Sequence, residues 1–148
     1  AFVGNSDDAY DLSQEAFIRA YRALKRYDGK HSFRSWFFAI LSNLCKNALR
    51  SSKVRRKFMI SDAAVIIEEV PAQGGPVEEY RGKVIKKLIW DALGTLDDDA
   101  REIIILKHFQ DMSYQEIAEI MKIPVGTVMS RIHYARLRLK KQIEVMNK

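Results

Sequence analysis

The chain has 148 residues, of which 25 are Lys or Arg and 19 are Asp or Glu, so its formal net charge is +6. Hydrophobic residues make up 47% of it, which is typical of a folded protein and excludes wholesale disorder. Its apolar runs are far shorter than the roughly 18 residues of a transmembrane helix. Its single cysteine, Cys45, excludes a disulfide framework and a multi-cysteine zinc site. Because no basic-then-apolar leader precedes the first polar residues, we expect a cytoplasmic protein.

The charges are unevenly distributed along the chain. Two basic blocks, residues 46–57 and 122–141, contain no acidic residue. Between them, residues 58–80 contain five acidic residues and no Lys or Arg. A single basic block is as often a solvated helix face as a phosphate-binding surface. Two such blocks, each at the end of a helical pattern, favour contact with phosphates.

The acidic segment also carries the signals of a linker. Pro71, Gly74, Gly75 and Pro76 fall within six residues. We therefore predict an all-α protein with two small helical domains joined by an acidic flexible linker. The predicted boundaries are 1–57 for the first domain, 58–80 for the linker and 81–148 for the second domain.

The first domain is predicted to contain two helices. In the first helix, residues with apolar side chains recur at a spacing of 3.6 and are expected to face inward; they are Leu12, Ala16, Phe17, Ala20, Tyr21 and Leu24. Asp28 and Gly29 indicate a turn, and Ser32 is a candidate cap for the second helix. The apolar stripe of that helix consists of Phe33, Trp36, Phe37, Ile40, Leu41, Leu44 and Ala48. Since two helices cannot bury both stripes alone, we expect a preceding helix or a partner to cover the rest. 

The second domain is predicted to contain four helices, the first over residues 82–93. Asp97 is the expected N-cap of the second helix, which buries Ile103, Ile104 and either Leu106 or Phe109. Ser113 and Glu116 have the spacing of a capping box at the start of the third. The inward positions of the fourth are Val128, Ile132, Ala135, Leu139 and Ile143.

The last two helices, within residues 113–145, have the pattern of a helix-turn-helix, with a tight turn at residues 122–126. Such a motif presents the first turns of its second helix to base edges in the major groove. Helical spacing places Gly126, Ser130 and His133 opposite the buried stripe. The flanking positions are Thr127, Met129 and Tyr134.

Enzymatic chemistry has little support in the sequence. The histidines His31, His108 and His133 are scattered, and no spacing indicates a metal site, a phosphate-binding glycine loop or a nucleophile with its base. Cys45 lies in an apolar stretch, which is typical of a buried and inert thiol. We expect no catalytic residues, metal or cofactor. A stand-alone helix-turn-helix regulator remains an alternative on these patterns.

Five sequence motifs resemble one bacterial family. Residues 111–136, DMSYQEIAEIMKIPVGTVMSRIHYAR, resemble region 4 of extracytoplasmic-function sigma factors, whose typical phrase is LSYEEIAEILGIPVGTVKSRLHRAR. Residues 96–107 are similar to the LPxxxREVLLLR segment of the same region. Residues 11–17, 32–37 and 43–50 resemble the region 2 phrases DLVQEAF, SFRTWL and NLAxDxLR. The two sets follow in the family's order.

The resemblance implies a sigma factor that binds core RNA polymerase and directs it to promoter DNA, and that an anti-sigma factor holds inactive. The residues implied to bind polymerase are Asp11, Gln14, Glu15 and Phe17. Those implied to recognise and melt the −10 element are Tyr27, Phe33, Trp36, Asn43, Lys46, Asn47 and Arg50, although core packing competes for Phe33 and Trp36. Those implied to read the −35 element are Thr127, Ser130, Arg131, His133, Tyr134 and Arg138.

The chain departs from the family pattern at several positions. Judged by the family pattern, we expect that most of the first helix of region 2 is missing from this sequence. Met129 stands where the family usually has Lys or Arg, and Tyr134 stands where it often has Arg. Each lost cation removes a phosphate contact, so we predict weaker phosphate attraction and a different promoter preference.

Overall fold

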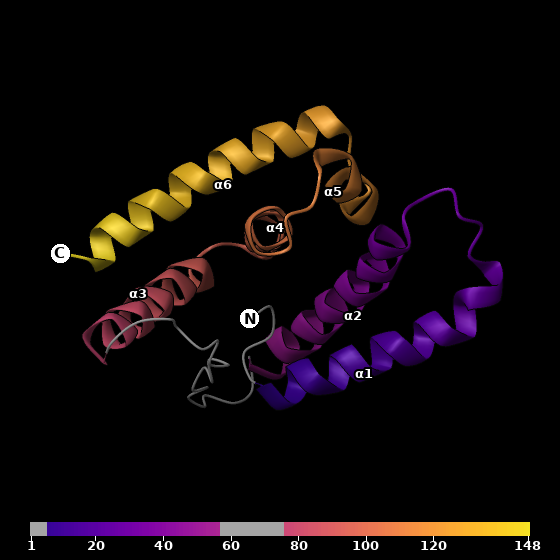
Figure 1. Cartoon of the computed structure of the whole chain (residues 1–148), viewed down its shortest axis with the longest axis horizontal. Coiled ribbons are helices and arrows are strands. Elements are labelled where there is room, and N and C mark those ends of the chain that lie inside the picture. The colour runs from indigo at the N-terminus through magenta and orange to yellow at the C-terminus, as the bar shows by residue number, and fades with distance from the viewer. Residues whose placement is uncertain (1–5, 57–75) are drawn as a thin grey trace.

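The computed structural model describes residues 6–56 and 76–148, and it forms only helices over these two ranges, as the sequence predicts (Figure 1). The first domain is a hairpin of α1 (Ser6–Ala23), extended by the 3-10 helix η1 (Leu24–Arg26), and α2 (Phe33–Arg56). The second domain comprises α3 (Pro76–Gly94), α4 (Asp98–Ile104), the π-helical segment η2 (Ile105–Phe109), α5 (Tyr114–Met121) and α6 (Val125–Met146). Most of the predicted linker lies outside the described residues.

Two helices begin earlier than their apolar patterns indicate. α1 begins at Ser6 and has Asp7 and Asp8 in its first turn, where acidic side chains favour the positive end of the helix dipole. α3 begins at Pro76, a residue that the sequence pattern assigns to the linker. Proline is favoured in the first turn of a helix because its missing N–H would have no helical partner there.

The predicted caps of the second domain are confirmed. The Asp97 carboxylate accepts a hydrogen bond from the Ala100 N–H at 2.9 Å. Ser113 and Glu116 form the reciprocal capping box, with distances of 3.1 and 2.9 Å. The turn before α6 is shorter than predicted: Lys122 ends α5 in the left-handed conformation, with φ of 56°, and Pro124 already caps α6.

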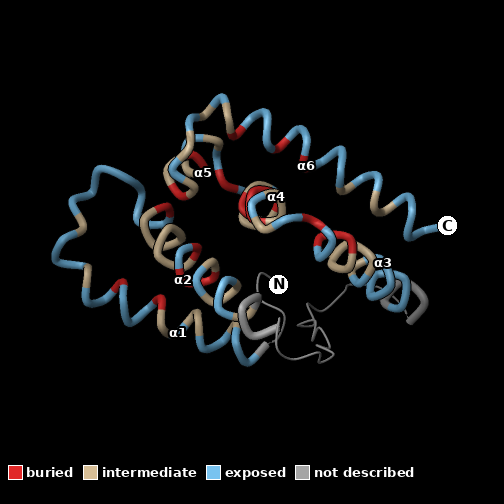
Figure 2. Tube along the Cα trace, turned by 180° about the vertical axis from the view of Figure 1, so that it is seen from behind, coloured by how far each residue is buried: buried red, intermediate tan, exposed pale blue. Residues whose placement is uncertain are grey.

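The core lies between the helices of the second domain, where Figure 2 shows buried residues on the facing sides of α4, α5 and α6. Val128, Ile132 and Ala135 of α6 are buried as predicted, and Leu139 packs against their cluster. Of the two alternatives in η2, Leu106 is buried, whereas Phe109 is 46% exposed and its ring lies tilted against that of Trp90, with a centroid distance of 4.9 Å.

The first domain has a much thinner core. Ala16 and Ala20 are the buried contacts of α1. Phe17 and Tyr21, which were predicted to face inward, are 65% and 81% exposed, so that prediction is wrong. The two small alanines let α1 approach α2 closely, and this leaves the larger side chains at the edge of the contact.

The second domain covers the side of α2 opposite α1, which buries part of the α2 stripe. Phe38 packs against the core of the second domain, and Ser35 and Ser42 are buried at the contact. Further contacts join the start of α2 to α5: Ser32 Oγ donates to Glu116 at 3.3 Å, and His31 Nδ1 lies 3.2 Å from Glu119 Oε1. The two domains therefore lie against each other along one side of α2 (Figure 1).

Candidate nucleic-acid interface

The outward face of α6 has the composition predicted for a recognition helix. Ser130 and His133 are exposed, on the side opposite Val128 and Ile132. The Ser130 hydroxyl donates to the Thr127 carbonyl at 3.1 Å, which is a local bond that does not tie the hydroxyl to the rest of the domain. Such short polar side chains can approach base edges in the major groove.

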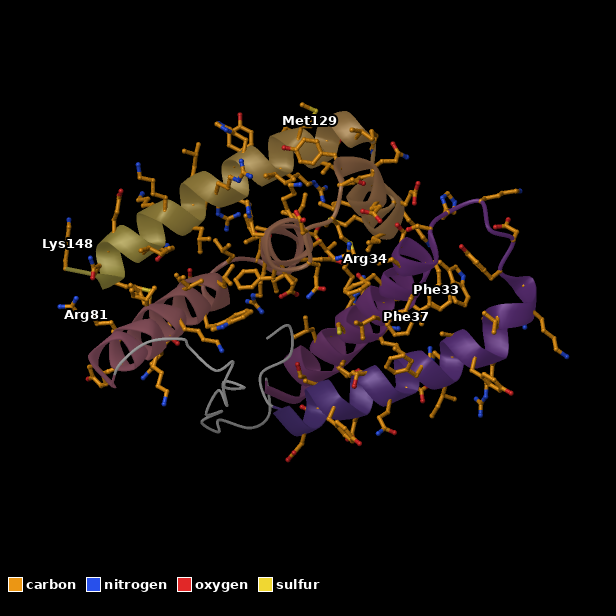
Figure 3. All side chains as sticks on the ribbon, viewed as in Figure 1. Phe33, Arg34, Phe37, Arg81, Met129 and Lys148 are labelled. Carbon is orange, nitrogen blue, oxygen red and sulfur yellow. The ribbon has the colours of Figure 1, made fainter. Side chains whose placement is uncertain are left out.

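Aromatic and sulfur-containing side chains flank this face. Tyr134 is 65% exposed and its ring lies edge-to-face with His133, at a centroid distance of 5.4 Å. Met129 projects away from the domain near the start of α6 (Figure 3). Thr127 is half-buried. The exposed face at the start of α6 thus has polar side chains at its centre and Met129 and Tyr134 at its edges.

The arginines of α6 are held by side chains of the α4–η2 segment. Arg131 NH1 lies 3.3 Å from Asp99 Oδ2, and Arg138 NH1 lies 2.5 Å from Asp97 Oδ2. Arg136 Nε donates to His108 Nε2 at 3.0 Å. Partial burial, together with the Arg136 charge, lowers the pKa of His108, which is consistent with a neutral imidazole that accepts this bond.

On α2, most of the residues predicted to bind the −10 element share one face. Trp36, Asn43, Asn47 and Arg50 follow at spacings of 7, 4 and 3, which is one stripe of an α-helix. The last three are exposed, and Trp36 is half-buried. The polar members of this stripe are therefore open to solvent along the second half of α2.

An aromatic cluster lies at the start of that stripe. The rings of Tyr27 and Trp36 are 5.0 Å apart, and those of Phe33 and Trp36 are 5.5 Å apart. The Tyr27 hydroxyl donates to the His31 carbonyl at 2.6 Å, which fixes the ring. Phe33 is 51% exposed despite these contacts, so it packs and also offers a ring surface on which an unstacked base can lie. Figure 3 shows Phe33 and Phe37 on the side of α2 that faces α1.

Lys46 is separated from the other predicted −10 residues. Its Nζ lies 2.8 Å from Glu102 Oε2, and the Ser42 hydroxyl donates to the same carboxylate. Near the start of α2, Arg34 donates to the Gln110 carbonyl, and Figure 3 shows its side chain directed toward the second domain. In this arrangement Lys46 belongs to the contact between the domains.

The residues predicted to bind polymerase lie on the outer part of α1. Asp11 and Gln14 are exposed, and Glu15 forms an ion pair with Arg19 at 2.6 Å. Phe17 is exposed but also contacts the Phe37 ring, at a centroid distance of 4.9 Å. Tyr10 and Tyr21, which lie outside the family motif of residues 11–17, are 65% and 81% exposed beside Phe17. Their positions, seven residues before and four after Phe17, place them on the same edge.

Three further features bear on function: the single cysteine, possible metal-binding clusters and possible membrane-spanning helices. Cys45 is buried, and this burial, with the nearby Glu102 charge, raises the pKa of its thiol to about 11. The predicted burial of this cysteine is thus confirmed, and a raised pKa disfavours the reactive thiolate. Within residues 6–56 and 76–148, no cluster of three His, Cys, Asp or Glu is placed to bind a metal ion. Nor does any helix in these ranges have the length and apolar character to cross a membrane.

Comparison with known proteins gives consistent matches over both domains. The family model "Sigma-70 region 2" matches residues 1–55, and "Sigma-70, region 4" matches residues 86–139. The chain is 33% identical to the ECF RNA polymerase sigma factor SigW of Bacillus subtilis, covering 95% of this chain and 78% of that protein. It is 35% identical to the ECF RNA polymerase sigma-E factor of Escherichia coli, covering 94% and 75%.

Two solved structures have the same fold. One is the sigma factor RpoE in complex with the anti-sigma factor NepR from Bartonella quintana, with a TM-score of 0.76, 25% identity, and coverage of 97% of this chain and 86% of that one. The other is CnrH in complex with the cytosolic domain of CnrY, with a TM-score of 0.65, 26% identity, and coverage of 95% and 73%. Both matches span the two domains of this chain.

Proposed function

The chain belongs to the extracytoplasmic-function family of RNA polymerase sigma factors, and we propose that its two exposed helical faces divide promoter recognition between them. As an alternative sigma factor it directs core RNA polymerase to promoters in transcription initiation. The first domain corresponds to region 2 and the second to region 4. In the proposed division, α2 recognises and melts the −10 element, and α6 reads the −35 element.

The observation that carries this proposal is the stripe on α2. Asn43, Asn47 and Arg50 are exposed on one face, and the half-exposed Phe33 ring lies at its start. Single-stranded bases are bound by stacking on aromatic rings and by polar groups along a groove, which are the groups present here. A stand-alone helix-turn-helix regulator requires no such surface, so the first domain argues against that alternative.

For the −35 element, we assign base contacts to the outward face of α6 and phosphate contacts to its edges. Ser130, His133 and Thr127 lie in the first turns of the helix, the part that meets base edges in this motif. Arg131, Arg138 and Tyr134 lie on an edge of the helix, where they suit contacts to the backbone. Binding by two weak sites on one chain gains strength once the polymerase holds both.

Polymerase binding is assigned to the outer part of α1. The polar residues Asp11, Gln14 and Glu15 and the exposed Phe17 form the expected surface, and Tyr10 and Tyr21 add aromatic area beside it. Aromatic residues are enriched at protein interfaces because they bury large areas with few rotatable bonds. We assign an anti-sigma factor as a further partner, because one structural neighbour, the sigma factor RpoE, was solved in complex with an anti-sigma factor. The setting is the cytoplasm, and RNA synthesis belongs to the polymerase rather than to this chain.

Paired variants test the proposed division. The chain is assembled with bacterial core polymerase, and its promoters are selected from genomic fragments by run-off transcription. Asn43→Ala with Asn47→Ala should retain duplex binding but reduce promoter opening, read by permanganate reactivity of unpaired thymines. Ser130→Ala with His133→Ala should instead lose selective binding, while Asn147→Ala serves as the control. Equal effects of both pairs on binding and opening would contradict the division.

A further inference from the structure

The three arginines of α6 share a feature that its lysines lack: each is bound by a side chain that lies outside the helix. Asp99 binds Arg131, Asp97 binds Arg138 and His108 binds Arg136. The contact of Lys140 is a looser pair with Glu144 at 3.9 Å, one turn along the same helix. The arginines are therefore restrained from outside the helix, and two of the three restraints are carboxylates that lie two residues apart at the start of α4.

The start of α4, which supplies these two carboxylates, is itself held by several hydrogen bonds. Asp97 caps α4 through the Ala100 N–H. The Arg101 side chain donates to the carbonyls of Leu93, Gly94 and Leu96 at 3.0, 3.0 and 2.9 Å, which secures the connection between α3 and α4. The Asp97 carboxylate is thus a fixed acceptor, and the backbone that leads into the turn carrying Asp99 is secured beside it.

Arg131 and Arg138 are seven residues apart and so lie on the same edge of α6. Their side chains are 42% and 53% exposed, so a DNA phosphate can reach both. Each of the two ion pairs uses one terminal nitrogen, whereas a guanidinium has five N–H donors. A restrained arginine can therefore donate to a phosphate that lies at one particular position without leaving its carboxylate.

We propose that Asp97 and Asp99 are specificity-determining residues, which restrain Arg131 and Arg138 so that these bind phosphates only when α6 lies in register on the −35 element. This inference rests on the proposed role of α6. Binding to unrelated DNA depends almost entirely on phosphate contacts. On unrelated DNA the phosphates lie at varied positions relative to α6, and each arginine must leave its carboxylate to reach a phosphate. The carboxylates thus weaken binding to unrelated DNA more than binding to the promoter.

Asp97→Asn and Asp99→Asn test this with little change in shape, because asparagine caps a helix about as well as aspartate. Affinity of the full chain for a random-sequence duplex is measured by fluorescence anisotropy at several salt concentrations. Each variant should bind about two- to five-fold more tightly, as expected from the strength of exposed ion pairs. The salt dependence should steepen by up to about one released ion per freed arginine. Promoter affinity of the assembled holoenzyme should change less.

The control Asp91→Asn removes a negative charge from α3 and reports the general electrostatic effect. The decisive comparison repeats Asp99→Asn in an Arg131→Gln background, and Asp97→Asn in an Arg138→Gln background. The gain in affinity should disappear in both. A gain that persists without the arginine, or that equals the Asp91→Asn control, overturns the inference, as does unchanged or undetectable binding of both variants to the random duplex. A wild-type chain that supports no promoter-selective transcription would instead count against the proposed function.

Discussion

Glu102 of α4 and Lys46 of α2 form an ion pair across the contact between the two domains, with 2.8 Å between Oε2 and Nζ. The glutamate side chain is 1% exposed, while the lysine side chain is 26% exposed. The buried carboxylate of one domain thus obtains its partners, Lys46 and the Ser42 hydroxyl, from the other domain. Promoter contact by Lys46 requires this pair to open.

The two members of the pair should differ in what their removal costs. Lys46→Gln leaves an uncompensated charge on a buried glutamate, and we expect it to lower the free energy of unfolding by about 3 kcal/mol. Glu102→Gln leaves a lysine that can turn to water, and we expect a loss of about 1 kcal/mol. Chemical denaturation of both variants measures the difference. 

The exposed pair of Arg19 and Glu15 supplies the control for this comparison. Arg19→Gln should change the free energy of unfolding by less than about 0.5 kcal/mol. If Lys46→Gln proves as mild as Arg19→Gln, the contact between the domains does not bury Glu102 in solution. Combining Lys46→Gln with Glu102→Gln should recover part of the loss caused by Lys46→Gln alone.

Lys122 provides a separate test of local strain. It has a φ of 56°, a conformation that costs a residue with a side chain roughly 1 kcal/mol. The family phrase has glycine at this position. Lys122→Gly should therefore raise the free energy of unfolding by about 0.5 kcal/mol, since glycine also gains freedom in the unfolded chain. Thermal melting measures this change. Lys87→Gly, in the middle of α3, is the control and should lower the free energy of unfolding by about 1 kcal/mol. Loss of stability in both variants would contradict the left-handed conformation.

The helix caps give the second domain a defined sensitivity to acid. Hydrogen bonds from the Ala100 N–H and from Arg138 lower the pKa of Asp97, and the Ser113 N–H lowers the pKa of Glu116. Because the unfolded chain takes up these protons at higher pH than the folded chain, their contribution is present above about pH 5 and is lost as the pH falls through the folded pKa values. Unfolding measured between about pH 6 and pH 3 should show this loss, with a smaller slope in Asp97→Asn and Glu116→Gln. An unchanged slope in both variants would refute the assignment.

Met129 is expected to limit attraction to DNA. It is 54% exposed near the start of α6, at a position where the family usually has a cation. Met129→Arg should tighten binding to duplex DNA and make the dependence on salt steeper by about one ion. Titration at several salt concentrations measures the slope. Met146→Arg, near the end of α6, is the matched control, and equal changes in the two slopes would mean that position on the helix is unimportant.

The sequence allowed the helices, the caps and the outward face of α6 to be predicted because these depend on local spacing and local hydrogen bonds. Asp97, the Ser113–Glu116 box and the buried stripe of α6 are all set within a few residues of chain. Tyr21 was wrongly placed in the core, because its helical position next to Ala20 does not reveal how closely α1 approaches α2. The pairing of Lys46 with Glu102 spans 56 residues, and nothing in either local pattern indicates it.

The ion pairs of Asp97 and Asp99 with α6 were also unpredictable from sequence. Their acidic turn was explained fully by helix capping, and only the crossing of α4 with α6 brings the arginines within reach. The assignment of −10 and −35 residues came from family resemblance. The structure adds that Trp36, Asn43, Asn47 and Arg50 share an accessible face, whereas Lys46 lies apart from it.

Transcription by a reconstituted holoenzyme tests the central claim most directly. The chain is mixed with bacterial core RNA polymerase, separated by gel filtration, and the complex is supplied with genomic promoter fragments for run-off transcription. The account predicts co-elution and transcripts from a small set of promoters, with selectivity lost in the Ser130→Ala, His133→Ala variant. Tight duplex binding by the free chain, without co-elution and without promoter-selective transcripts, would contradict it.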